Sequence, residues 1–139
     1  MKKKVILVTS LLFILLIFFV KIIGFAEKPL EISKMCTIKQ SDIYIDDYLY
    51  YDYIEIYNPN KKSVYIGEYG ISNNKDNLFK YTIMNGLWLG AKDSIIIYFS
   101  SEYTGENWTV AKFDINEKDE YIYLTDSKGK IVSKIENVK

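Results

Sequence analysis

The chain of 139 residues contains no histidine, and all eighteen of its basic side chains are lysines. It therefore lacks the usual general base near neutral pH and the guanidinium fork that clamps phosphates and carboxylates, which argues against an enzyme. The formal charge of zero is divided: residues 1–26 carry four lysines and no acid, and the remainder, with fourteen lysines and eighteen acids, stands at −4. A domain of that sign has no basic surface for a phosphate backbone, so nucleic acid is excluded as a partner.

Residues 1–26 have the pattern of a membrane-targeting segment. Lys2–Lys4 precede a sixteen-residue apolar run at 5–20, and Gly24–Ala26 form a small-x-small site. One interpretation is a secretory signal that is cleaved after Ala26. The other is an uncleaved anchor, because a helix that runs on from residue 5 to Ala26 covers about 33 Å, enough for a hydrocarbon core of about 30 Å. We favour the anchor through residues 5–26; in both cases the chain from Glu27 onward lies outside the cytoplasm.

From Glu27 onward the apolar residues alternate with polar ones, and turn formers interrupt them every eight to twelve residues. This pattern is typical of a β-sandwich or barrel. We expect about eight to nine strands, with a further short edge strand inside the acidic connection 41–47. We expect these strands among ten candidate segments: 30–37, 48–58, 63–66, 68–72, 78–84, 87–89, 94–100, 110–114, 121–125 and 131–135.

The tyrosine-rich stretch "YLYYDYIEIYNPN", residues 48–60, is a strand that ends at an Asn-Pro-Asn turn. Alternation places Ile54 and Ile56 on the inward face. The tyrosines fall on the opposite face, where a ring with a polar tip suits a half-buried surface. Further along the chain, Asn85-Gly86 predicts a hairpin turn between 78–84 and 87–89. The run 94–100 is apolar on both faces, which predicts a central strand.

Tests for chemistry at particular residues are negative. Cys36 has no partner for an intramolecular disulfide, so we interpret it as a small buried hydrophobe. The acidic cluster Asp42, Asp46, Asp47 and Asp52 matches no calcium-binding loop, so we interpret it as a solvated connection. Zinc is excluded for want of histidine and further cysteine. We therefore predict no catalytic residues, no metal and no cofactor.

Aromatic side chains form the candidate binding surface. Tyr48, Tyr50 and Tyr51, with Trp108 in the longest polar loop, could stack on a protein partner or on sugar rings, since tyrosine and tryptophan dominate interface hot spots. The alternative is that the rings pack across strands within the sheet. The sequence leaves both interpretations open.

Four segments in order resemble the lamin tail domain, a small immunoglobulin-like β-sandwich that also occurs in exported bacterial proteins. They are "DYIEIYNP" (52–59), "VYIGEYGISNN" (64–74), "YTIMNGLWLGAKDSIIIYFSS" (81–101) and "FDINEKDEYIYLTDSKGKIVSKI" (113–135). The resemblance covers Leu30 to about Val138. It departs from the family pattern at Ile83–Gly86, where the family often has a Phe-Pro turn, and at Lys92-Asp93. The family has no shared catalytic residues, so the resemblance implies an interaction or scaffold module.

The expected architecture is an all-β, immunoglobulin-like two-sheet sandwich over residues 27–139, preceded by a hydrophobic helix within residues 1–26. The expected function is a non-catalytic, extracytoplasmic binding or scaffolding module of the cell envelope. An unidentified envelope or extracellular protein is the favoured partner, and a membrane is contacted through residues 5–26 if these are not cleaved. The alternative function is a carbohydrate-binding module for cell wall or exopolysaccharide.

Overall fold

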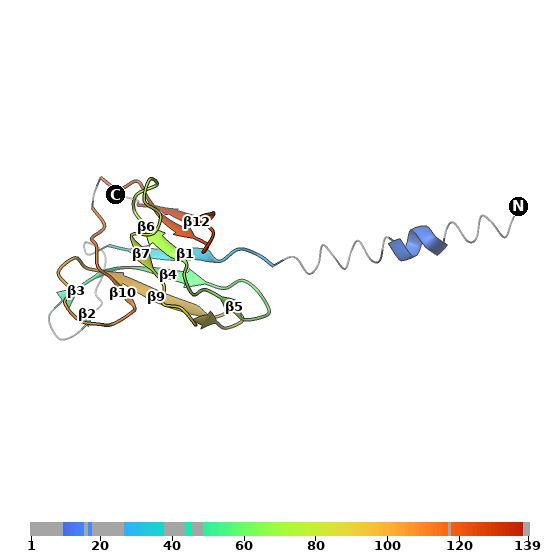
Figure 1. Cartoon of the computed structure of the whole chain (residues 1–139), viewed down its shortest axis with the longest axis horizontal. Helices are drawn as coiled ribbons and strands as arrows, with labels where there is room; N and C mark the ends of the chain where they lie inside the picture. The colour runs from blue at the N-terminus through green and yellow to red at the C-terminus, as the bar shows by residue number, and fades with distance from the viewer. Residues whose placement is uncertain are drawn as a thin grey trace, which may run out of the picture.

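The computed structural model (Figure 1) describes residues 10–15, 17, 27–37, 44–45, 49–116 and 118–137, and for 44–45 and 49–50 it describes the backbone. Residues 10–15 are helical, and every other regular element of the described chain is a β-strand. No helix in these ranges is long and apolar enough to cross a membrane. The expected signal or anchor lies mostly outside the described residues and stays a prediction.

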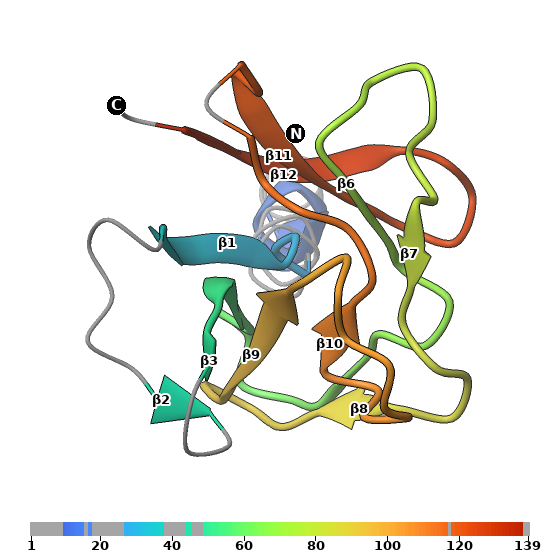
Figure 2. The ribbon, with the colours of Figure 1, turned by 90° about the vertical axis from the view of Figure 1, so that its left-hand side faces the viewer.

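Two four-stranded sheets lie face to face as two layers (Figures 1 and 2). The first has the order β1 (Glu31–Cys36), β4 (Asp52–Tyr57), β9 (Ser94–Phe99) and β10 (Val110–Ala111). The second has the order β12 (Ile131–Glu136), β11 (Tyr121–Thr125), β6 (Gly70–Ser72) and β7 (Tyr81–Thr82). Two short ribbons pair β2 (Tyr44–Ile45) with β3 (Leu49–Tyr50) and β5 (Val64–Tyr65) with β8 (Trp88–Leu89). The expected all-β, immunoglobulin-like sandwich is confirmed, with the four ribbon strands in addition to eight main ones.

The core fills the space between the sheets with apolar side chains from both layers. Ile54 and Ile56 of β4 are fully buried, as the alternation in this strand predicts. β9 lies between β4 and β10, as expected for a central strand. The outward Ile96 of β9 is nevertheless 36% exposed, so one face of this strand is open to solvent. The fully buried apolar side chains are Ile54, Ile56, Ile66, Ile71, Ile83, Leu89, Ile97, Ile122 and Leu124.

Hydrogen bonds join the two sheets at both edges. On one side β1 lies against β12, and the backbone N–H of Ile32 donates to Ser133 Oγ at 2.9 Å (Figure 2). On the other side the hydroxyl of Tyr81 in β7 donates to the carbonyl oxygen of Trp108, two residues before β10. The edge strands of each sheet thus contact the opposite sheet, which positions the loops between them.

The predicted hairpin at Asn85-Gly86 is wrong. β7 pairs with β6 and β8 pairs with β5, so the two segments that flank this dipeptide do not pair with each other. The N–H groups of Ile66 and Gly67 both donate to Leu87 O, which continues the pairing of β5 and β8 toward β6 and β7. Glu68, with a φ of 66°, lies in the connection from β5 to β6, and Gly86, with a φ of 86°, lies in the connection from β7 to β8. These positive φ angles occur where the chain passes between the β5–β8 ribbon and the second sheet. Long-range pairing overrides the local turn signal.

The outer face of β4 carries tyrosines, as predicted, but Tyr53 is buried there. Tyr53 lies opposite Tyr98 of β9, with ring centroids 6.1 Å apart at an interplanar angle of 61°. Lys34 Nζ of β1 lies 5.5 Å from the centroid of the Tyr53 ring. Tyr53 is therefore a cross-strand packing residue. Cys36, beside it on β1, is free and buried, as predicted.

Candidate functional site

The loop of residues 101–109, which we call the aromatic loop, presents Tyr103 and Trp108 at one end of the sandwich. β9 and β10 are parallel, and Val110 lies beside Tyr98. The chain must therefore turn back on itself between these strands, and the loop extends beyond the end of the sheet. In Figure 1 it lies beside the β2–β3 ribbon, at the opposite end of the domain from β5.

Hydrogen bonds within the aromatic loop hold it in one shape. Asn107 Oδ1 accepts from both the backbone N–H and the hydroxyl of Thr109, at 3.0 and 2.8 Å. The backbone N–H of Asn107 donates to the Tyr103 hydroxyl at 3.3 Å, and the Trp108 carbonyl oxygen accepts from Tyr81. Hydrogen bonds to Trp108 itself and to both of its neighbours, Asn107 and Thr109, thus fix the backbone here. The Trp108 side chain remains 37% exposed.

The hydrogen bond from Tyr81 requires the neutral phenol. Burial raises the pKa of Tyr81 above its ordinary value of about 10. The hydroxyl therefore keeps its proton at physiological pH and acts as a donor to Trp108.

Of the four residues predicted to form the aromatic surface, Trp108 is the one whose exposed side chain the structure describes. Tyr51 is 4% exposed, so it does not belong to the surface. Its ring packs edge to face against that of Tyr103, with centroids 6.4 Å apart, and this contact attaches the aromatic loop to the start of β4. Tyr50 lies in β3 without a described side chain, and Tyr48 lies outside the described residues. For these two the surface role stays a prediction.

Sequence reasoning missed Tyr103, although it lies in the same polar loop as Trp108. The available signal was its position in the sequence, four residues after the aromatic pair Tyr98-Phe99 at the end of β9. The contact with Tyr51 depends on how the loop folds back over the start of β4, and the local sequence does not contain that information.

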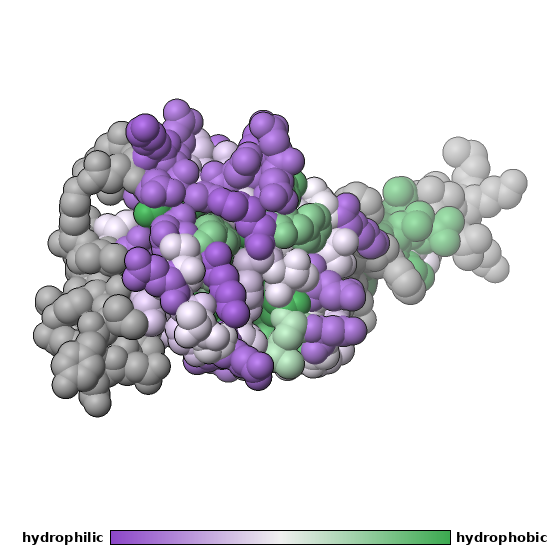
Figure 3. All heavy atoms as spheres, turned by 60° about the vertical axis from the view of Figure 1, so that its left-hand side comes forward, coloured by the Kyte–Doolittle hydropathy of each residue, from purple (hydrophilic) through white to green (hydrophobic). Residues whose placement is uncertain are grey.

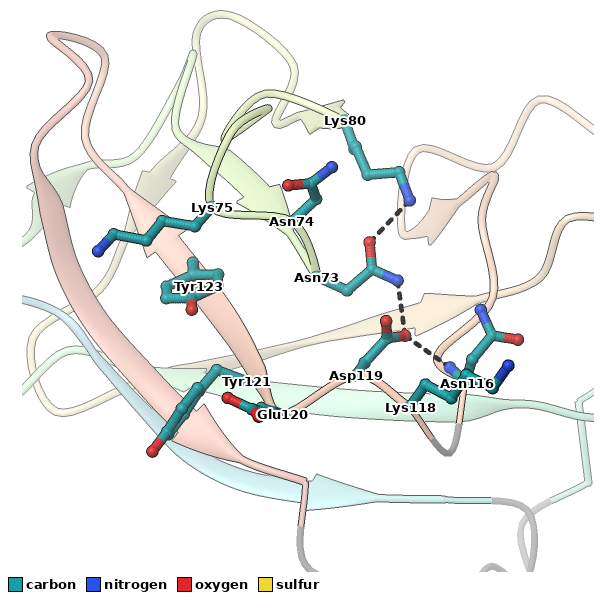
Figure 4. A pocket seen from close by; sticks show the side chains of 10 residues that line it. All are labelled: Asn73, Asn74, Lys75, Lys80, Asn116, Lys118, Asp119, Glu120, Tyr121 and Tyr123. Carbon is teal, nitrogen blue, oxygen red and sulfur yellow. Dashed lines mark hydrogen bonds between the residues drawn. The ribbon is translucent and has the colours of Figure 1, made fainter.

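A second candidate is an open hollow of about 410 Å³, which we call the polar hollow (Figure 4). Lys80 Nζ donates to Asn73 Oδ1 at 2.7 Å, and Asn73 Nδ2 donates to Asp119 Oδ2 at 2.7 Å. Asp119 Oδ2 also accepts from the backbone N–H of Asn116 at 2.7 Å. This network holds Asn116 and Asp119 against Asn73 in the β6–β7 loop. Its lining is Asn73, Asn74, Lys75, Lys80, Asn116, Lys118, Asp119, Glu120, Tyr121 and Tyr123.

The described residues contain no group of three or more metal-ligating side chains of the His, Cys, Asp and Glu types. Asp42, Asp46 and Asp47 of the acidic connection lie outside the described residues, so their interpretation as a metal-free loop stays a prediction. On the sandwich, the face shown in Figure 3 is mostly hydrophilic with small apolar areas, whereas the helical residues 11–15 are apolar and exposed. A binding role for this face therefore depends on individual aromatic side chains.

Comparison with known families gives a match to the lamin tail domain over residues 29–139. Comparison with the curated proteins gives no match. The match covers most of the chain and begins two residues before β1. The two-sheet, all-β architecture is consistent with this match. The chain belongs to the lamin tail domain family, whose immunoglobulin-like domains are generally non-catalytic binding or scaffold modules.

Proposed function

We propose that this lamin tail domain is an extracytoplasmic binding or scaffolding module of the cell envelope, and that it binds an envelope or extracellular protein through the aromatic loop. The lysine-led apolar segment in residues 1–26 supports the location. The exposed Trp108 on a hydrogen-bonded loop is the observation that carries the binding role.

The physical reason is preorganisation. A tryptophan can contribute much of the free energy of an interface when it enters a pocket on the partner. A loop that is already ordered loses little conformational entropy on binding, so more of that free energy remains as affinity. The hydrogen bonds of Asn107 and Tyr81 provide this order around Trp108.

The test is in-cell cross-linking of the full chain, followed by recovery of cross-linked proteins. Trp108→Ala should lower the recovery of a specific partner by about tenfold or more, because loss of a hot-spot tryptophan weakens binding by at least that factor. Met84→Ala is the control, since it removes another exposed apolar side chain, outside the aromatic loop, and should leave recovery unchanged. Equal recovery from the wild type and both variants would reject the aromatic loop as the binding surface.

The location has a separate test. The intact mass of the envelope-associated protein distinguishes an anchor that retains residues 1–26 from a mature chain that begins at Glu27. We expect the retained form. Recovery of the chain from the cytoplasmic fraction with its N-terminus intact would contradict both forms of the proposal.

The polar hollow supports a second candidate, a carbohydrate-binding module. Amide groups and tyrosine rings are suited to sugar hydroxyls and ring faces, and the hollow brings three asparagines together with Tyr121 and Tyr123. Lys134 Nζ lies over the Tyr121 ring, 3.9 Å from its centroid, and so covers one face of it. Tyr123 is therefore the better candidate for stacking on a sugar ring. An insoluble-polysaccharide pull-down decides this candidate: wild type should sediment, and Tyr48→Ala, Tyr50→Ala, Trp108→Ala and Tyr123→Ala variants identify the surface. Wild type that remains in the supernatant excludes it.

A further inference from the structure

The chain enters the domain next to the Asn-Pro-Asn turn, at the end opposite to the aromatic loop (Figure 1). The Asn60 side chain and the Lys28 backbone exchange two hydrogen bonds: Lys28 N–H donates to Oδ1 at 2.8 Å and Nδ2 donates to Lys28 O at 2.9 Å. Lys92 joins the same end, because its backbone N–H donates to Asn60 O at 3.2 Å and its Nζ donates to Pro59 O at 2.6 Å. We call residues 27–28, 58–62 and 88–93 the lysine end.

The lysine end has the opposite charge to the rest of the domain. It contains Lys28, Lys61, Lys62 and Lys92 with two acids, Glu27 and Asp93, and so has a net charge of +2. The other ten lysines and sixteen acids from Glu27 onward give −6. All four lysines are exposed. A local positive region on an acidic domain orients it toward an anionic surface.

Trp88 adds an exposed aromatic ring to this end. It is 61% exposed, against 37% for Trp108. Its ring packs edge to face on Tyr65, with centroids 5.3 Å apart, so it stands in a defined position. The neighbouring Leu89 carbonyl oxygen accepts from Asn58 Nδ2 at 3.1 Å, which attaches β8 to the Asn-Pro-Asn turn. Exposed tryptophan together with lysine is the side-chain combination that lies at the headgroup level of membranes.

We propose that the lysine end docks on an anionic phospholipid surface, with Trp88 among the headgroups and the four lysines beside lipid phosphates. The inference rests on the proposed extracytoplasmic anchor and deepens it. Lys28 is already bonded to Asn60, so an anchor that runs through Ala26 leaves one residue, Glu27, between the membrane helix and the folded domain. Such a short connection holds the lysine end at the membrane, where even weak lipid contacts are populated. The aromatic loop then points away from the membrane toward a protein partner.

The chain has two tryptophans, so fluorescence can report on each end separately. The full chain is reconstituted into phosphatidylglycerol-containing vesicles with brominated acyl chains, which quench nearby indoles. Trp108→Phe leaves Trp88 as the fluorophore, and its emission should fall by about twofold, since interfacial indoles lie close to the acyl chains. Trp88→Phe leaves Trp108, whose emission should be unchanged.

The contribution of the lysines is tested in the Trp108→Phe background. Lys61→Glu/Lys62→Glu should relieve most of the Trp88 quenching, because it reverses two charges at the docking end. Lys128→Glu/Lys130→Glu makes the same charge change on the exposed turn between β11 and β12 and should leave quenching unchanged. Phosphatidylcholine vesicles should reduce the quenching of Trp88 in the Trp108→Phe protein that keeps all its lysines.

The outcomes separate this inference from the proposed function. A chain that floats with the vesicles while Trp88 remains unquenched overturns the docking alone, as does equal quenching in the two lysine pairs. A chain that does not float with the vesicles overturns the anchor and, with it, the docking that rests on it. The cross-linking test of Trp108 is independent of either result.

Discussion

The Tyr81 hydroxyl donates a hydrogen bond to the Trp108 carbonyl oxygen, and this contact joins the edge of one sheet to the aromatic loop of the other. Tyr81 lies in the edge strand β7, and Trp108 lies two residues before the opposite edge strand β10. One half-buried phenol therefore contributes to sandwich stability and to the shape of the candidate binding loop.

Replacing Tyr81 tests both contributions. Tyr81→Phe should lower the free energy of unfolding at pH 7 by about 1 kcal/mol, the typical net value of a hydrogen bond. Burial raises the folded-state pKa of Tyr81, so its stabilising contribution is complete below the unfolded-state value of about 10 and is lost as pH rises through the folded-state pKa.

Urea unfolding at pH 7 to 11 measures both effects. The variant should lose less stability than wild type above pH 10. Some alkaline loss should remain, because burial, with Asp126 and Glu27, also raises the pKa of Tyr69. Parallel stability curves for the two proteins would contradict the assignment.

Asn58 is a buried amide that organises the lysine end. Its Nδ2 lies 2.9, 3.1 and 2.8 Å from the carbonyl oxygens of Lys62, Leu89 and Gly90. Asn58→Ala leaves these three acceptors, of which the Leu89 carbonyl is buried, without their donor and should lower the free energy of unfolding by about 2–4 kcal/mol. Urea denaturation measures the loss. The exposed Asn74→Ala is the control, and it should change stability by less than about 1 kcal/mol; similar losses in the two variants would be inconsistent with the role of Asn58.

Ile96 and Ile97 of β9 give a matched pair on opposite faces of one strand. Ile97 is fully buried, whereas Ile96 is 36% exposed. Ile97→Ala should lower the free energy of unfolding by about 2–5 kcal/mol through lost burial and the cavity that remains. Ile96→Ala should cost about 1 kcal/mol or less, because more than a third of this side chain already lies in water and its removal leaves no enclosed cavity. Thermal or urea unfolding compares them, and a larger loss from Ile96→Ala would reverse the assignment of the inner face.

Thr125 Oγ1 is, in the described part of the chain, a buried side-chain oxygen that has no hydrogen-bond partner. Thr125→Val replaces the hydroxyl by a methyl group of similar size. The variant should gain about 1 kcal/mol in the free energy of unfolding, because an unsatisfied buried hydroxyl is removed. The same substitution at exposed Thr82 serves as control and should have a small effect. A clear loss in Thr125→Val would mean that the hydroxyl has a partner such as a buried water.

Local patterns predicted the elements whose structure depends on near neighbours. The alternation around Ile54 and Ile56 was enough to predict β4 and its inner face. The apolar run at 94–100 was enough to predict that β9 lies inside its sheet. The hairpin predicted at Asn85-Gly86 does not form, because its flanking segments pair with strands in residues 64–72 instead of with each other. Tyr51 was expected at the surface because nothing in its own strand indicates that the aromatic loop, about fifty residues away, covers it.

The polar hollow shows the same limit. Its central contact joins Asn73 to Asp119 across 46 positions of the chain. Each segment alone has the composition of an ordinary turn, so sequence reasoning interpreted both as connections. The fold brings their polar groups together.

The contact between β1 and β12 has a consequence for how the molecule is made. The hydrogen bond from Ile32 to Ser133 spans 101 positions, so the two layers cannot close on this side until the segment from β1 to β12 is available. A topology dominated by such distant pairings folds in milliseconds to seconds. For a chain exported as proposed, β12 leaves the translocation channel about a hundred residues after β1. Until then β1 lies beside the membrane unpaired with β12, and its exposed side chains, Glu31, Ser33 and Lys34, keep that early strand soluble.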